Sequence, residues 1–236
     1  MTHAFKADFH MHTRHSGDSL SCVEDVLAAA VKKGLSAIAI TDHDEIAGAL
    51  EAQLIARSRK LPLQVIAGEE VRTDAGDLLV YFVKKRIAPG KLEDVLAEAK
   101  RQGAVCAAAH PYDFARHGID LQELGSGAAD KIDAIEVFNA RVPLASQNAR
   151  AMGFALKNKK AFLAGSDAHH PSEVGAAYVE FYGVDTLDAH ALLHAHRKIG
   201  GKRSPPLVRF YSRYAVMRKK LAEIFRFRAS ECSWRE

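Results

Sequence analysis

Five short apolar runs of this chain are each followed at once by side chains of the kind that bind metal ions. Runs of this length, bounded by loop residues, are typical of buried strands, and the carboxyl ends of parallel strands lie on one side of a sheet or barrel. The polar side chains are therefore expected to meet in one pocket that holds more than one metal ion. The runs are 5–9 before His10 and His12, 37–40 before Asp42 and His43, 65–67 before Glu69 and Glu70, 104–109 before His110, and 161–164 before Asp167 and His169.

The spacing within these motifs supports the same interpretation. Side chains alternate along a strand, so His10 and His12 point to the same side, and so do Asp167 and His169. Imidazole suits zinc, iron and manganese, and a carboxylate can bridge two cations. A single buried histidine or aspartate is commonly a hydrogen-bonded core residue or a helix cap. Five such motifs at equivalent strand ends favour a multinuclear site.

The rest of the sequence predicts an α/β fold. Amphipathic stretches separate the apolar runs, which indicates about seven strand–helix units with helices outside a parallel sheet or barrel. The run over 78–83 fits either a hairpin or the next barrel strand. Further strands are expected over 132–138 and 176–181, and helices over 21–33, 45–59, 91–102, 144–158 and 186–198.

The chain changes character after Gly200 and Gly201. The segment 201–236 carries ten Lys or Arg against three Glu, a balance of +7 that leaves −3 for the first 200 residues. We therefore divide the chain into a barrel over 1–200 and a basic amphipathic tail over 201–236, with a helix over 208–228. This helix contacts nucleic acid, anionic lipid or an acidic partner, or it packs on the barrel; we favour packing, because most apolar stripes are core faces. The stripe consists of Phe210, Tyr214, Met217, Leu221, Ile224 and Phe225.

Composition excludes several classes of protein. No apolar stretch approaches the roughly 20 residues of a membrane span, and the first residues lack the apolar region of a signal peptide, so a cytoplasmic protein is expected. The three cysteines are widely spaced and include no C-x-x-C pair, which argues against a disulfide framework or a thiolate zinc site. No sequence pattern sets an oligomeric state.

The ordered motifs resemble one known family, the polymerase and histidinol phosphatase (PHP) superfamily of metal-dependent phosphoesterases. The resemblance extends from residue 8 to about residue 180. It implies a distorted (β/α)7 barrel with two or three divalent ions, zinc, manganese or iron, at the carboxyl end of the strands. The motifs that carry it are His10-x-His12, Thr41-Asp42-His43, Gly68-x-Glu70, His110-Pro111 and Ser166-Asp167-x-His169.

The resemblance also implies which residues bind the ions. The bridging carboxylate would be Glu70, because the family pattern is glycine, any residue, then glutamate, and Glu69 would point the opposite way. Asp77 stands where the family often has a histidine. The implied ligands are His10, His12, Glu70 and Asp167 for the first ion, Glu70, His110 and Asp77 for the second, and Asp18, His43 and His169 for the third.

Other residues near the strand ends are given supporting roles. Asp42 is expected to orient a ligating imidazole, because such a ring usually donates its second nitrogen to a carboxylate or carbonyl. Arg141 is expected to clamp a phosphate group with its planar fork, or else to be a surface residue. Glu136 and Asn139 resemble a family segment that lines the site. His15 and His170 are expected either to contact substrate or to face solvent.

This set of residues predicts hydrolysis of a phosphate ester. Two cations lower the pKa of a bridging water and make hydroxide available near neutral pH. The expected substrate is a small phosphomonoester, such as a nucleotide or a histidinol-phosphate-like metabolite. One alternative is a phosphodiesterase or exonuclease on nucleic acid, which the basic tail favours but the barrel does not. A second alternative is a metal-stabilised interaction module without enzymatic activity.

Overall fold

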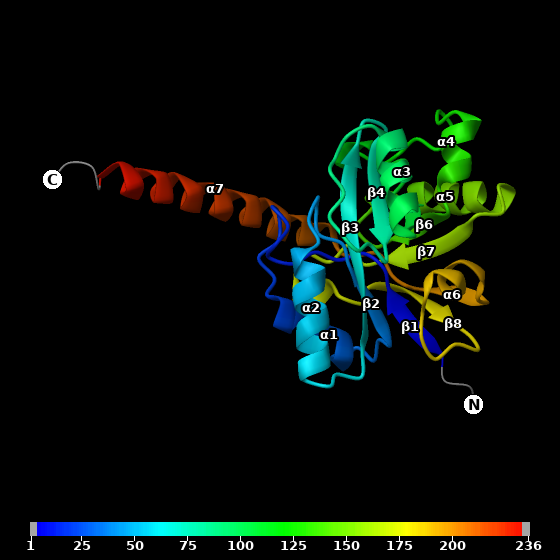
Figure 1. The fold of residues 1–236 in the computed structure, drawn as a ribbon, viewed down its shortest axis with the longest axis horizontal. Coiled ribbons are helices and arrows are strands. Elements are labelled where there is room, and N and C mark those ends of the chain that lie inside the picture. Colours follow the sequence, from blue (N-terminus) through cyan, green and yellow to red (C-terminus); the bar gives the residue numbers. More distant parts are fainter. Residues whose placement is uncertain (1–3, 233–236) are drawn as a thin grey trace.

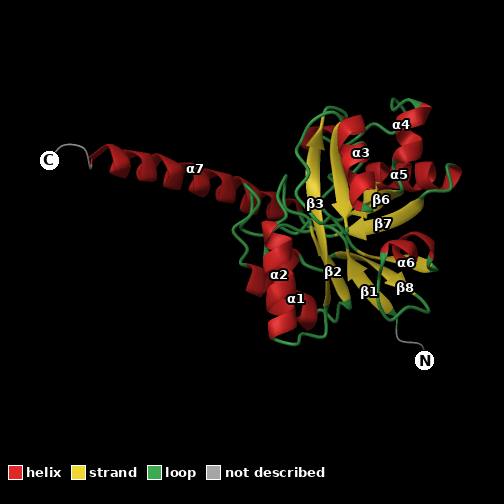
Figure 2. Ribbon diagram, in the orientation of Figure 1, coloured by secondary structure: helices red, strands yellow, loops and turns green. Residues whose placement is uncertain are grey.

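The computed structural model describes residues 4–232, with the side chains of 126 and 223–232 left aside, and forms an α/β barrel with one projecting helix (Figure 1). The helices lie outside the sheet, with α1 and α2 on one flank and α3, α4 and α5 on another (Figure 2). The strands are β1 (Phe5–Asp8), β2 (Ala37–Ile40), β3 (Gln64–Thr73), β4 (Gly76–Tyr81), β5 (Val105–Ala108), β6 (Ala134–Asn139), β7 (Ala161–Gly165), β8 (Ala177–Phe181) and β9 (Arg197–Gly201). The α-helices are α1 (Val23–Lys32), α2 (Ala47–Ser58), α3 (Leu92–Gln102), α4 (Ser126–Lys131), α5 (Ala145–Lys157), α6 (Ala189–His194) and α7 (Arg209–Cys232).

The strands of the described chain form one sheet in the order β7-β6-β5-β4-β3-β2-β1-β8-β9. β1, β2, β3, β5, β6 and β7 run parallel to one another, whereas β4 is antiparallel to both of its neighbours. β8 and β9 extend the sheet beyond β1 as antiparallel strands. All five strands that precede the polar motifs therefore point the same way, and their carboxyl ends lie together.

Backbone hydrogen bonds between the ends of β1 and β7 close the barrel. Phe9 N–H donates to the carbonyl of Ala164 at 3.2 Å, Asp167 N–H to that of His10 at 2.7 Å, and His12 N–H to that of Ala168 at 2.8 Å. The seven strands β1 to β7 thus form the expected distorted barrel. The closing segments are the same ones that carry His10, His12 and Asp167, so closure and site assembly depend on one set of contacts.

Aromatic rings fill the interior of the barrel beside the site. Phe9 packs edge-on against Tyr81 and Phe181, with ring centroids 5.6 and 5.9 Å apart. The hydroxyl of Tyr81 donates to the carbonyl of Phe9 at 3.1 Å, which satisfies its polar end in the core. Small residues such as Ala39 and Ala107 leave room for these rings. This packing fixes the chain immediately before His10.

Helix α3 shows how the helices deliver the chain to the strands. Its buried residues Leu92, Val95, Leu96 and Ala99 recur at intervals of three and four, which places them on one face against the sheet. The helix ends at Gly103, whose φ of 71° lies in the left-handed region that glycine adopts without a steric penalty. β5 begins two residues later.

Two expectations about secondary structure were wrong. β3 does not end at residue 67 but continues to Thr73, because β4 returns as the second arm of a hairpin and pairs with it antiparallel. The helix expected over 186–198 is confined to α6, and the following residues form β9, because the edge of β8 is open for pairing.

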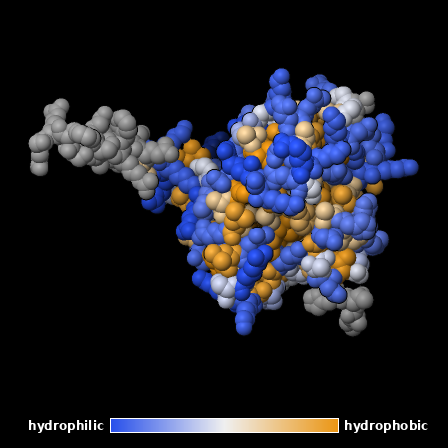
Figure 3. Space-filling model, viewed as in Figure 1, coloured by the Kyte–Doolittle hydropathy of each residue, from blue (hydrophilic) through white to orange (hydrophobic). Residues whose placement is uncertain are grey.

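The tail helix α7 does not pack its apolar stripe on the barrel, which corrects the expectation we favoured. It leaves the body of the molecule (Figure 1), and its first turns show apolar and polar surface side by side (Figure 3). Phe210, Tyr214, Met217 and Leu221 are 46–61% exposed, and Ala215 is the only buried residue among the α7 side chains that the structure describes, 209–222. Ile224 and Phe225 lie outside the described side chains. Within residues 4–232, no helix has the length and apolar character to cross a membrane.

Candidate metal centre

The first of three clusters contains the two histidines that follow β1. His10 Nε2 and His12 Nε2 lie 3.1 Å apart, and both face the same carboxylate oxygen, Glu70 Oε2, at 3.1 and 3.3 Å. Asp167 Oδ1 completes the group at 3.8 and 3.5 Å from the two nitrogens. All four side chains are almost completely buried. Strand alternation places His10 and His12 on one side, and the contact between β1 and β7 adds Asp167. The cluster therefore joins residues from both ends of the barrel sequence.

The second cluster uses the other oxygen of the same glutamate. Glu70 Oε1 lies 2.9 Å from His110 Nε2, and Asp77 from the start of β4 has a carboxylate oxygen within the same group. Glu69 points away and accepts a hydrogen bond from Ile87 N–H at 2.7 Å. Glu70 therefore faces two clusters at once, as a bridging carboxylate must.

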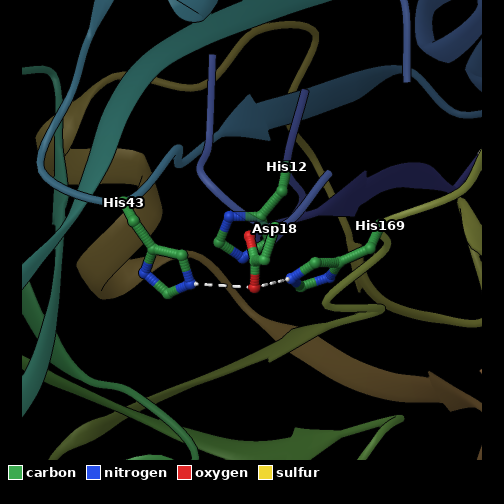
Figure 4. A group of neighbouring side chains, drawn as sticks. All are labelled: His12, Asp18, His43 and His169. Atoms are coloured by element: carbon green, nitrogen blue, oxygen red, sulfur yellow. Dashed lines mark hydrogen bonds and ion pairs between the residues drawn. The ribbon is translucent and has the colours of Figure 1, made fainter. Parts of the chain in front are cut away.

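The third cluster lies next to the first and shares His12 with it. Asp18 reaches in from the loop after β1 and sits between two imidazoles, with Oδ2 2.8 Å from His169 Nε2 and 3.5 Å from His43 Nε2 (Figure 4). His43 Nδ1 also lies 3.2 Å from Glu70 Oε2. The three clusters thus form one continuous group of donor atoms.

The geometry of these atoms fits divalent ions. Zinc–ligand bonds of about 2.1 Å place neighbouring ligand atoms about 3.0–3.4 Å apart in octahedral or tetrahedral coordination. The contacts of His10 and His12 with each other and with Glu70 fall in that range. Asp18 Oδ1 and Asp77 Oδ1 are buried and have no hydrogen-bond partner among the described residues, and Asp77 Oδ1 forms an ion pair with Arg72 Nε at 3.5 Å. Buried carboxylate oxygens without partners are costly, and ions would satisfy them.

The charged groups of the site shift one another's pKa values, and metal binding therefore depends on pH. Burial lowers the pKa of His43, but the carboxylates of Glu70 and Asp18 outweigh it and raise the value to about 10. Burial would raise the pKa of Glu70, but His10 and His43 hold it well below its usual range. The metal-free site therefore balances buried carboxylates with protonated imidazoles.

We expect zinc binding to the metal-free protein at pH 7 to release protons. An imidazole must be neutral to bind a metal, and His43 with a pKa of about 10 carries a proton at this pH. Apparent affinity should rise with pH up to that value, by at most about tenfold per pH unit for each proton released. Titration calorimetry in buffers of different ionisation enthalpy measures the release. A binding enthalpy that is the same in every buffer would contradict this assignment.

Polar groups behind the clusters fix the histidine rings. Glu136 Oε1 lies 2.9 Å from His10 Nδ1, and its other oxygen accepts a hydrogen bond from His110 N–H at 2.6 Å. Ser16 Oγ lies 3.0 Å from His12 Nδ1 and accepts from His43 N–H at 2.9 Å. Donation by each Nδ1 leaves the Nε2 lone pair facing the cluster. Sequence reasoning noted Glu136 but missed Ser16, whose only signal was its place in the loop before Asp18.

Replacing Glu136 by Gln should weaken zinc binding by about 10–100-fold, because the charge that orients His10 and makes it a better donor is lost. A competition titration with a zinc-binding dye measures the change. Glu123→Gln, at an exposed position, is the matched control and should bind zinc like the wild type. Equal affinities of the two variants would show that Glu136 does not support the site.

Asp42 does not orient an imidazole, contrary to our expectation. Its two oxygens accept hydrogen bonds from Thr13 N–H at 2.6 Å and from the Thr13 hydroxyl at 2.7 Å. Both oxygens are thus used in tying the loop after β1 to the loop after β2. Its backbone carbonyl accepts from Glu70 N–H at 3.1 Å. Asp42 therefore positions the loops rather than a ring.

Arg141 borders the pocket, but its fork is not free to clamp phosphate. Its guanidinium is buried, with Nη1 2.6 Å from His169 Nδ1 and Nε 3.2 Å from Glu173 Oε2. Nη2 donates to the carbonyl of Val208 at 2.9 Å and to the hydroxyl of Ser212 at 3.0 Å. The expected role was wrong because residues distant in sequence occupy every nitrogen of this side chain.

The remaining predicted residues are Asn139, which lies at the site, and His15 and His170, which contact other side chains. Asn139 lies at the site and donates to Asp167 Oδ2 at 3.0 Å. His15 is paired with Glu51, 2.6 Å away, and His170 stacks on Tyr211 of α7 with ring centroids 4.5 Å apart. Arg116, which sequence reasoning missed, forms an ion pair with Asp167. The only indication of this role in the sequence was that Arg116 is a basic residue in the loop after His110.

Comparison with protein families bears directly on this site. The family profile described as PHP domain matches residues 8–154, which is more than half of the chain and includes all the clustered residues except Asp167 and His169. This chain belongs to the PHP domain family. A second profile, described as PHP-associated, matches residues 145–198 and covers those two residues of this PHP domain.

Two curated relatives of this PHP domain come from Methanocaldococcus jannaschii, and both are uncharacterized proteins. One is 33% identical over an alignment of 147 residues, and the match covers 57% of this chain and 82% of that protein. The other is 30% identical over an alignment of 185 residues, and the match covers 75% of this chain and 70% of that protein.

Two solved structures share the fold of this PHP domain. One, from Bacteroides vulgatus, is a two-domain protein described as containing a predicted PHP-like metal-dependent phosphoesterase; it is 22% identical, with a TM-score of 0.63, and the match covers 77% of this chain and 59% of that one. The other is PsfC from Pseudomonas syringae, which is 20% identical, with a TM-score of 0.67 and coverage of 94% and 100%.

Proposed function

We propose that this PHP domain is a phosphoesterase that uses two or three divalent ions to hydrolyse a small phosphomonoester, such as a nucleotide or a histidinol-phosphate-like metabolite. The barrel over 1–200 is the catalytic unit in this proposal, and 201–236 is a basic tail. The position of Glu70 carries it, because one buried carboxylate faces two groups of metal-type donors. Mixed imidazole and carboxylate donors suit zinc, manganese or iron.

The residues of the chain hold the ions, align the ligands and shape the pocket in which the reaction takes place. Bound divalent ions supply an activated water and positive charge for the phosphoryl oxygens. Glu70, with one oxygen toward each of two clusters, would hold neighbouring ions and offset their repulsion. Glu136 and Ser16 keep the rings of His10 and His12 aligned, so that the donor atoms need little rearrangement during turnover. The buried clusters open on one side into a pocket of about 350 Å³, which suits a small ester.

Elemental analysis combined with a substrate panel tests the proposal. The purified protein is expected to contain two or three equivalents of zinc, manganese or iron and to hydrolyse phosphomonoesters faster than phosphodiesters. Removal of the metal with a chelator should abolish turnover, and addition of the metal should restore it. Metal-loaded protein without phosphatase activity on the panel would argue for the interaction module instead.

Phosphodiester cleavage of nucleic acid is the second candidate, and the tail favours it. Arg213, Arg218 and Lys220 are exposed on α7 and could track a phosphate backbone. Binding that uses several phosphate contacts weakens steeply with salt. Affinity for single-stranded and double-stranded oligonucleotides at increasing salt therefore distinguishes this candidate, and a flat response would reject it.

A further inference from the structure

The tail helix α7 forms one border of the pocket in front of the metal clusters. Barrel residues such as His43, Glu70 and His169 line the pocket, and α7 adds Arg209, Ser212 and Arg213 to its lining. Arg209 is half-buried and Arg213 is exposed, whereas Glu70 and His169 are buried. The two arginines therefore lie on the solvent side of the clusters.

Specific contacts hold the beginning of α7 in this place. Arg209 donates to the carbonyl of Arg141 at 3.0 Å, and Arg141 donates to Val208 and Ser212 in return. Further along the helix, Lys219 donates to the carbonyl of Arg14 at 2.8 Å, in the loop after β1. The helix is thus fixed to the barrel at two places, and these contacts do not involve the exposed apolar stripe.

Arg209 and Arg213 form no ion pair among the described residues, although Asp113 and Asp167 act on Arg209 from a greater distance. Arg116 and Arg141, which also border the pocket, form ion pairs with carboxylates, but Arg209 and Arg213 have none within 4.0 Å in the described part of the chain. The two are four residues apart on one helix face, where like charges repel. Burial and then the charge of Arg116 lower the pKa of Arg209. An anion in the pocket would relieve this repulsion.

We propose that Arg209 and Arg213 bind an anionic group of the substrate on the solvent side of the phosphoryl group that is hydrolysed. The preferred substrates are then phosphate esters that carry a second negative group on the leaving side. Planar guanidinium forks suit phosphate and carboxylate oxygens. This inference rests on the proposed function and adds to it a substrate class and two specificity-determining residues.

A matched pair of esters tests the inference. Glycerol 3-phosphate and 3-phosphoglycerate share a three-carbon skeleton, but only the second carries a carboxylate. The metal-loaded wild type is expected to show the higher kcat/KM for 3-phosphoglycerate. The double variant Arg209→Ala, Arg213→Ala should lose about 10–100-fold on this substrate, as expected for two charge-assisted contacts. Its loss on glycerol 3-phosphate should be much smaller.

The control removes the same charge from another helix. Arg57→Ala, Arg59→Ala affects exposed residues at the end of α2 that do not line the pocket and should leave the ratio of the two kcat/KM values unchanged. The Arg213→Ala single variant, which breaks no contact within the described chain, should show part of the effect with an unchanged melting temperature. A double variant with the wild-type ratio, or a control with the same loss, would overturn the inference.

Calorimetric binding of the same two esters separates this inference from the proposed function. If the wild type hydrolyses neither ester but binds 3-phosphoglycerate more tightly, and the double variant loses that preference, the arginine assignment holds and the phosphoesterase proposal fails. If hydrolysis is observed but neither turnover nor binding responds to the arginines, the phosphoesterase proposal holds and the arginine assignment fails. If the wild type neither hydrolyses nor binds either ester, both are rejected.

Discussion

Replacing Glu70 by Gln is expected to remove most of the bound metal and to reduce phosphoester hydrolysis by about 10³-fold or more, because several kcal/mol of transition-state stabilisation depend on the bound ions. The amide keeps the size of the side chain but loses its charge and one of its two acceptor oxygens. Those oxygens face His10 and His110 in separate clusters, so both clusters lose a ligand. Elemental analysis and turnover of a model phosphomonoester measure the two effects.

The neighbouring residue provides a precise control for this experiment. Glu69→Gln makes the same chemical change one position earlier, on the opposite side of β3, where the side chain accepts from Ile87 N–H. This variant should retain wild-type metal content and activity. Circular dichroism should show that both variants fold. A Glu70→Gln protein with full turnover would refute the bridging role, whatever its metal content.

Gly165→Ala is expected to damage both stability and the site. A Cβ atom at this position would lie 2.2 Å from His10 Cβ and 2.9 Å from His10 N, where β7 closes against the extension of β1. The backbone must move to relieve that overlap, at a cost of about 2–3 kcal/mol in the free energy of unfolding. His10 moves with it, so zinc affinity should also fall. Chemical denaturation and zinc titration measure the two changes.

Gly153 in α5 offers the opposite case. A Cβ there meets no atom within 4 Å, and the residue is an exposed helical position. Gly153→Ala should therefore stabilise the protein by roughly 0.5–1 kcal/mol and leave zinc affinity unchanged. Equal stability of the two alanine variants would show that the joint between β1 and β7 is looser than the structure indicates.

The elements whose signals are local could be predicted from the sequence. α3 followed from its apolar spacing and from Gly103, and the short strands followed from apolar runs that end in polar motifs. β9 and the second half of β3 were missed because they are strands only by virtue of their partners. Arg197–Gly201 pairs with β8, and residues after Ala67 pair with β4. Such pairing depends on tertiary structure, which the local pattern does not contain.

Some features of the candidate site could likewise be predicted from the sequence, and others could not. The resemblance to the family pattern of glycine, any residue, then glutamate selected Glu70, and strand alternation turned Glu69 to the opposite side, so this choice was available before the structure. The partners of Asp42 and Arg141 could not be predicted from the sequence. Thr13 contacts Asp42 because of how two loops are arranged, and Ser212 contacts Arg141 because of where the tail helix lies. Arg209 and Arg213 were hidden for the same reason. Their helix was expected, but its position beside the pocket is set by contacts far from its own sequence.

The proposed metal-binding residues and the two arginines of α7 lie in different parts of the sequence. The segment that matches the PHP family profiles ends at residue 198, and Arg209 and Arg213, two of the arginines that border the pocket, come after it. If these two arginines select the substrate, as we propose, substitutions in α7 alter what the pocket accepts while the strands that gather the histidines stay unchanged.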